Sequence, residues 1–122
     1  MVVEDEQGVL SIIVKHLLHA GFRVITAKDG MEGLKKVKEG GYDLVITDIV
    51  MPYVSGAGVL TAAKERDPKI PVIAMTGFGQ ESESLAIEKN ADRVLSKPVT
   101  IVELKRHIDD LLRSSRKEYG PQ

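Results

Sequence analysis

Short apolar segments rich in β-branched residues alternate with segments of helical periodicity along the chain, and this alternation constrains the fold more than any other feature. The apolar segments predict five strands, at residues 1–3, 22–26, 43–47, 71–76 and 93–96. Each is followed by a segment that predicts a helix, at residues 7–20, 29–39, 55–65, 81–89 and 100–112. Strands and helices that alternate in this way form a parallel sheet with right-handed crossovers and a helical layer on each face. The sequence therefore predicts an α/β fold.

The length and composition are those of one globular domain of this class. The 122 residues are 43% hydrophobic and 29% charged, which argues against a disordered chain. The lack of cysteine excludes disulfides, thiolate zinc sites and cysteine nucleophiles, and a net charge of −1 gives no support for binding to nucleic acid or to an anionic membrane. No apolar run could span a bilayer, and the chain does not begin like a secretory signal. We expect one soluble cytoplasmic domain.

Polar side chains stand at the ends of four of the five predicted strands. Glu4 and Asp5 follow the first strand, and Asp48 follows the third. Thr76 ends the fourth strand, and Lys97 follows the fifth. Because the carboxyl ends of parallel strands meet at one edge of a sheet, where ligands bind, we expect these side chains to gather at one site.

The chemistry of this set points to a metal and to phosphoryl transfer. Carboxylates gathered at one edge repel one another and need a cation or a raised pKa. Oxygen ligands without histidine or cysteine suit Mg²⁺ or Ca²⁺, and a carboxylate beside such a metal can attack phosphorus to give an aspartyl phosphate. That displacement needs positive charge and a hydroxyl donor around the phosphoryl oxygens. Asp48, Mg²⁺, Lys97 and Thr76 can fill these four roles.

Four motifs in this order resemble the signatures of bacterial response-regulator receiver domains. They are the pair Glu4-Asp5, the run from Val45 to Pro52 around Asp48, the pair Thr76-Gly77 and the pair Lys97-Pro98. The resemblance covers residues 1–114 and leaves residues 115–122 as a C-terminal tail or the start of a linker. It implies a doubly wound, flavodoxin-like sheet with strand order 2-1-3-4-5 and five helices, and a cis peptide bond before Pro98 that would help to aim Lys97.

The resemblance also implies roles for single residues. Asp48 would accept a phosphoryl group from the phosphohistidine of a histidine kinase. Mg²⁺ would be held by Asp5, Asp48 and the backbone carbonyl of Val50, with Glu4 acting directly or through water. Thr76 would donate a hydrogen bond to a phosphoryl oxygen, and Lys97 would form an ion pair with the phosphoryl group. Such a domain catalyses its own phosphorylation and dephosphorylation and is not an enzyme that acts on a separate substrate.

The partners that the resemblance implies are a sensor histidine kinase or a phosphotransfer protein, a downstream target or a covalently linked output domain, and a second copy of the phosphorylated chain. Their contact surface would be the face formed by the fourth helix, the fifth strand and the fifth helix, residues 80–89, 93–96 and 100–112. We expect neither nucleic acid nor a membrane to bind directly.

Three features depart from the usual pattern of the family. Glu4 stands where aspartate is commoner, which adds a methylene group to the side chain. Val94, three residues before Lys97, occupies the usual place of an aromatic switch residue, so a rotating ring cannot relay the signal. The first strand has only three residues before the acidic pair, where a central strand normally has five or six.

Two apolar residues occupy positions that border the path of the hydrolytic water in receiver domains. Val50 lies two residues beyond Asp48, and Phe78 lies two residues beyond Thr76. Neither side chain can orient water by hydrogen bonding, so we expect a long-lived phosphorylated state.

Two other functions fit parts of the pattern. An Mg²⁺-dependent phosphatase that forms an aspartyl phosphate would carry its aspartate pair on the first strand, spaced Asp-x-Asp, whereas the candidate nucleophile here follows the third. A flavodoxin-like ligand-binding module would carry a loop rich in serine and threonine after the first strand, whereas this chain has the acidic run from Glu4 to Glu6.

Overall fold

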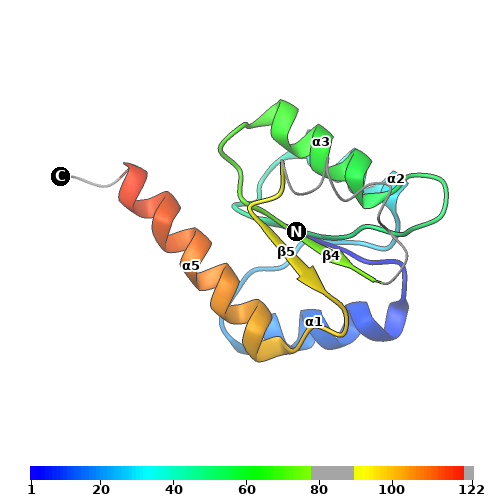
Figure 1. Cartoon of the computed structure of the whole chain (residues 1–122), viewed down its shortest axis with the longest axis horizontal. Helices are drawn as coiled ribbons and strands as arrows, with labels where there is room; N and C mark the ends of the chain where they lie inside the picture. The colour runs from blue at the N-terminus through cyan, green and yellow to red at the C-terminus, as the bar shows by residue number, and fades with distance from the viewer. Residues whose placement is uncertain (78–89, 120–122) are drawn as a thin grey trace.

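The computed structural model describes residues 1–77 and 90–119, with side chains described as far as residue 114 (Figure 1). Its centre is one sheet of five parallel strands in the order β2-β1-β3-β4-β5. The strands are β1 (Val2–Val3), β2 (Thr26–Ala27), β3 (Val45–Asp48), β4 (Val72–Thr76) and β5 (Arg93–Ser96). The predicted fold class and strand order are confirmed.

Helices cover both faces of the sheet. They are α1 (Gln7–His19), α2 (Gly30–Glu39), α3 (Gly56–Arg66) and α5 (Ile101–Tyr119). Helices α1 and α5 lie on one face and α2 and α3 on the other, as Figure 1 shows. The remaining predicted helix, at residues 81–89, lies outside the described residues. Within the described part of the chain, no helix is both long and apolar enough to cross a membrane.

The core is divided into two apolar layers by the sheet. Because successive side chains of a strand point to opposite faces, neighbouring residues of one strand contribute to different layers. Val2, Ile46 and Ile73 pack with α1 and α5, whereas Val3, Val45 and Val72 pack with α2 and α3. The nearly continuous apolar runs of β3 and β4 are therefore those of strands that are buried on both sides.

Hydrogen-bonded caps begin two of the helices where the sequence predicts them. The side chain of Asp29 accepts a hydrogen bond of 2.8 Å from the amide of Glu32 at the start of α2. The hydroxyl of Thr100 accepts one of 3.1 Å from the amide of Glu103 at the start of α5. Each cap satisfies a backbone donor that has no partner within the helix.

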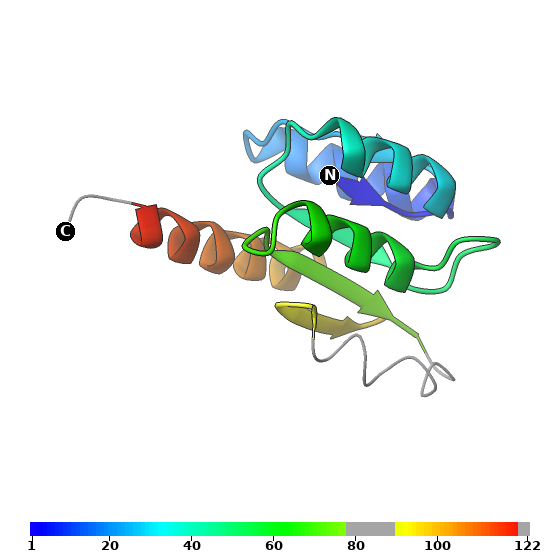
Figure 2. The ribbon, with the colours of Figure 1, turned by 90° about the horizontal axis from the view of Figure 1, so that it is seen from above.

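The third strand begins at Val45, two residues later than predicted, and includes Asp48 as its last residue. Two boundaries differ more widely from the sequence prediction. The predicted strand at residues 22–26 is reduced to Thr26–Ala27, because β1 offers only Val2 and Val3 as pairing partners at this edge. At the other end of the chain, α5 continues to Tyr119, beyond residue 112 and into the segment predicted as a tail. The residues after 112 include no proline or glycine before Gly120, so the backbone can remain helical. Figure 2 shows that this end of α5 extends away from the other elements.

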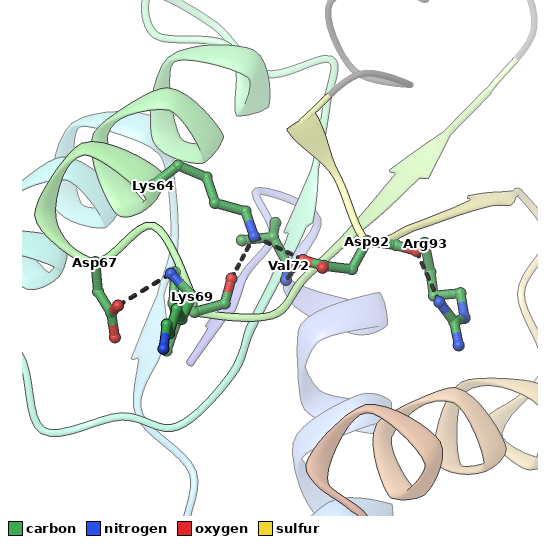
Figure 3. A network of polar contacts seen from close by, with 7 residues as sticks. Lys64, Asp67, Lys69, Val72, Asp92 and Arg93 are labelled. Atoms are coloured by element: carbon green, nitrogen blue, oxygen red, sulfur yellow. Dashed lines mark hydrogen bonds and ion pairs between the residues drawn. The ribbon is translucent and has the colours of Figure 1, made fainter. Parts of the chain in front are cut away.

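A polar network joins the amino-terminal ends of β4 and β5 to α3 (Figure 3). Lys64 Nζ donates to the carbonyl of Ile70 at 2.6 Å and to Asp92 Oδ2 at 2.8 Å. The same Asp92 oxygen accepts a hydrogen bond of 2.8 Å from the amide of Val72. The network therefore anchors the beginning of β5. It lies at the edge of the sheet that is opposite to the carboxyl ends of the strands.

Candidate functional site

The strand register places the predicted site residues at the same edge of the sheet. Val3 pairs with Thr47, so Glu4 and Asp48 follow at the same level on neighbouring strands. Thr76 pairs with Ser96 at the corresponding end of β4 and β5, and Lys97 comes next. The amide of Lys97 also donates a hydrogen bond of 2.7 Å to the carbonyl of Thr76.

Three carboxyl groups converge at this edge. Glu4, Asp5 and Asp48 each offer an oxygen atom, and these atoms lie within 4.8 Å of one another. Glu4 has no exposed surface, Asp48 is 3% exposed and Asp5 is half-buried. The backbone amide of Ile49 donates a hydrogen bond of 2.9 Å to Asp48 Oδ1 and so orients that carboxylate. The cluster that the sequence predicts from strand ends is therefore present in the fold.

Lys97 brings the positive charge to this cluster. Its Nζ lies 3.0 Å from Asp48 Oδ2 and 3.1 Å from Glu4 Oε1. The peptide bond between Lys97 and Pro98 is cis. The lysine therefore contacts two of the three carboxyl groups directly.

The proximity of these groups changes their acidity. Burial and, to a smaller extent, the neighbouring Asp48 raise the pKa of Glu4 to about 7, although the contact with Lys97 lowers it. Partial burial alone would lower the pKa of Lys97, but its contacts with Asp48 and Glu4 outweigh this effect and raise it above the ordinary value. Glu4 can therefore hold a proton near neutral pH while Lys97 remains charged.

The other predicted site residues differ in how far they are exposed. Thr76 is half-buried at the end of β4. Val50 follows the phosphoacceptor candidate by two residues and is 58% exposed. Val94 lies on β5 and is 40% exposed. Phe78 lies outside the described residues.

One residue that matters for the site was missed by the sequence analysis. Gly56, the first residue of α3, lies so close to the end of β3 that a Cβ atom there would be 1.9 Å from the carbonyl oxygen of Asp48. Only glycine fits without movement of the Asp48 backbone. The sequence signal for this close contact is a glycine at the first position of a helix. Glycine is a poor helix former, so its presence there indicates a role other than favouring the helix.

The donor set fits a divalent cation. Its three carboxyl groups carry more negative charge than the single ammonium group of Lys97 can neutralise. All the offered atoms are oxygens, which Mg²⁺ prefers, and a cation would offset the burial and the repulsion from Asp48 that raise the pKa of Glu4. The residues present therefore suit Mg²⁺.

Comparison with known proteins identifies the family. Residues 1–109 match the family described as the response regulator receiver domain. The chain belongs to this family. It is a receiver domain of the two-component response regulators, and its cluster of Glu4, Asp5 and Asp48 is consistent with a Mg²⁺-binding phosphorylation site. Membership favours a phosphoacceptor over both the phosphatase and the flavodoxin-like binding module.

Individual relatives agree with this assignment. The transcriptional regulatory protein PrrA of Mycobacterium tuberculosis is 35% identical over 114 residues, which are 93% of this chain and 49% of PrrA. The CheY-like receiver domain protein of Methanospirillum hungatei has a TM-score of 0.91 and 28% identity, with 96% of this chain and 94% of that chain covered. The response regulator TrrA of Thermotoga maritima, solved in complex with Mg²⁺-BeF, has a TM-score of 0.81 and 33% identity, with 90% and 95% covered. The chain spans about half the length of the curated relatives that it matches.

Proposed function

We propose that the receiver domain is the phosphoacceptor of a two-component phosphorelay and that Asp48 is the residue that becomes phosphorylated. The observation that carries the proposal is the contact of 3.0 Å between Asp48 and Lys97 inside a cluster of three carboxyl groups. A nucleophile for phosphorus, a positive charge for the phosphoryl oxygens and oxygen ligands for a metal are thereby next to one another.

The transfer step follows from this arrangement. A carboxylate oxygen of Asp48 attacks the phosphorus of a phosphohistidine, and the new P–O bond forms while the P–N bond breaks. The imidazole nitrogen of the donor keeps the electron pair of the broken bond. Lys97 forms an ion pair with the phosphoryl group, and the hydroxyl of Thr76 donates a hydrogen bond to one of its oxygens.

Mg²⁺ would be held by Asp5, Asp48 and the backbone carbonyl of Val50, with Glu4 bound directly or through water. When bound, the metal supplies positive charge that offsets the charge on the phosphoryl oxygens. Glu4 would act in its ionised form, since a protonated carboxyl group offers less charge to a cation. Because Lys97 already contacts Glu4 and Asp48, we expect it to shift towards the phosphoryl group when a metal takes over these carboxylates.

We further propose that a sensor histidine kinase or phosphotransfer protein supplies the phosphoryl group in the cytoplasm. The output would pass through the face that includes β5 and α5 to a downstream target, a linked output domain or a second phosphorylated copy. The exposed Val94 on β5 and Val102 on α5, which is 81% exposed, support this surface. The predicted contribution of residues 80–89 lies outside the described residues.

The decisive experiment uses a small phosphodonor and intact-protein mass spectrometry. With acetyl phosphate and Mg²⁺, the wild type should gain one phosphoryl group, and Asp48→Asn should gain none while keeping its circular dichroism spectrum. Asp43→Asn is the matched control, because Asp43 is exposed just before β3 and should leave phosphorylation unchanged. An equal adduct on Asp48→Asn would assign the chemistry to another residue.

A further inference from the structure

The loop that carries Val50, between β3 and α3, is held at both ends. The amide of Gly56 donates a hydrogen bond of 2.8 Å to the carbonyl of Ile49 and so closes the loop at its base. Within it, the amide of Val54 donates one of 2.8 Å to the carbonyl of Pro52, whose ring restricts the backbone. Because the loop is short and its two ends are joined, we expect a displacement at one of its residues to move the neighbouring ones.

Gly30, at the start of α2, lies directly against this loop. A Cβ atom on Gly30 would be 2.1 Å from the carbonyl oxygen of Val54 and 2.8 Å from its Cβ atom. The nearest obstacle is backbone, so a side chain here would force the loop or the helix to move. The two backbones can approach this closely only because residue 30 has no side chain.

Contacts with neighbouring elements hold helix α2 in place, so it cannot easily move away from the loop. Its first turn is capped by Asp29, and Lys36 Nζ donates to the carbonyl of Thr26 on the neighbouring strand β2. One turn after Gly30, Gly33 packs against the side chains of Val3 and Val59 in the core. A side chain added at residue 30 would therefore displace the loop more readily than the helix.

We propose that Gly30 is a positioning residue for the phosphorylation site: the absence of its side chain sets the position of Val54 and, through the closed loop, of the Val50 carbonyl. This inference rests on the proposed function, in which that carbonyl binds Mg²⁺. It assigns α2, which contributes no ligand, a direct part in shaping the metal site.

The test compares two glycines of the same helix. Gly30→Ala should weaken Mg²⁺ binding, measured by isothermal titration calorimetry, by about tenfold, the lower end of what loss of an outer supporting group does to metal affinity. Gly33→Ala is the matched control: the three atoms nearest to its Cβ atom would belong to the side chains of Val3 and Val59, at 3.1 to 3.4 Å, and none of the three lies in the loop. It should change the melting temperature but leave the Mg²⁺ dissociation constant within about twofold of the wild type.

The outcomes separate the possible failures. A folded Gly30→Ala with the Mg²⁺ affinity of the wild type would overturn the inference, as would an equal loss of affinity in Gly33→Ala. If the wild type itself does not bind Mg²⁺, the proposed function fails and not merely the role of Gly30.

A second measurement needs no variant and applies even if Gly30→Ala does not fold. In the wild type, Mg²⁺ should shift the backbone amide resonances of Gly30 and Val54 together with that of Val50. Shifts confined to the ligands, with Gly30 and Val54 unchanged, would show that the loop does not transmit metal binding to α2 and would overturn the inference.

Discussion

Lys97 Nζ lies 3.1 Å from Oε1 of Glu4, a residue with no exposed surface, although the two residues are 93 positions apart in the chain. The ammonium group lowers the pKa of Glu4 against the stronger effects of burial and of Asp48. The lysine is therefore both the proposed phosphoryl ligand and the cation that makes a buried acidic cluster tolerable in the absence of metal.

Replacement of this cation should destabilise the domain more at high pH than at low pH. Lys97→Ala leaves Glu4 and Asp48 without their shared partner. Loss of one member of a buried ion pair lowers the free energy of unfolding by up to about 3–5 kcal/mol. We expect less, since the Lys97 side chain is 28% exposed. The free energy of unfolding should fall more at pH 8, where Glu4 would have to ionise, than at pH 5.

Lys105→Ala is the control for that measurement, because Lys105 forms an exposed ion pair of 2.9 Å with Asp109. It should change the free energy of unfolding by no more than about 0.5 kcal/mol at either pH. Equal pH profiles for Lys97→Ala and the wild type would contradict the proposed role of the lysine.

Mg²⁺ affinity should rise with pH through the titration of Glu4. Its pKa is raised from 4.5 to about 7, so its contribution to stability without metal is complete below its unfolded pKa and is lost as the pH rises through about 7. Mg²⁺ must displace this proton. Calorimetric titrations at pH 6 and pH 8 should therefore differ in dissociation constant by up to about tenfold, with tighter binding at pH 8.

Glu4→Gln provides the comparison for this pH effect. Glutamine keeps the shape of the side chain but cannot ionise, so the dissociation constant of this variant should vary much less between pH 6 and pH 8. A wild-type affinity that does not change over this range would remove Glu4 from the metal site.

Mg²⁺ should also raise the melting temperature of the domain, because it binds the folded cluster and relieves the repulsion of its carboxylates. At a hundredfold excess over the dissociation constant, the gain in the free energy of unfolding is about 2.7 kcal/mol. Asp5→Ala should show a smaller Mg²⁺-induced shift in differential scanning fluorimetry. Glu6→Gln, at an exposed neighbouring position, should keep the full shift; equal shifts in the wild type and Asp5→Ala would refute the metal site.

The phosphorylated state should be long-lived, since Val50, two residues beyond Asp48, is apolar and exposed. A polar residue there could orient a water molecule, and one such contact, about 1–1.5 kcal/mol, corresponds to roughly a tenfold change in rate. Val50→Asn combined with Phe78→Glu should therefore accelerate loss of the phosphoryl group in a phosphoprotein decay assay. Val102→Asn, on the exposed face of α5, is the control and should decay like the wild type. Equal half-lives for the wild type and the double variant would count against the role of these two positions.

Much of the fold is encoded locally and could be predicted from the sequence. The apolar runs of β3 and β4 and the caps at Asp29 and Thr100 depend on neighbours in the chain, so their spacing alone reveals them. The strand order follows from the resemblance to a family, because periodicity does not say which strands pair. The short β2 could not be predicted, since its length depends on how much of β1 is available to it.

The sequence by itself determined which chemical groups stand at the strand ends: Glu4, Asp5, Asp48, Thr76 and Lys97. Only the tertiary structure decided the environment of these groups. The complete burial of Glu4, its raised pKa and its contact with Lys97 arise from strands that are distant in the chain. The close approach of Gly30 to Val54 likewise joins two separate elements. The physical reason is the same in each case: desolvation and steric contact depend on which atoms surround a residue in space, and residue spacing along one strand or helix does not contain that information.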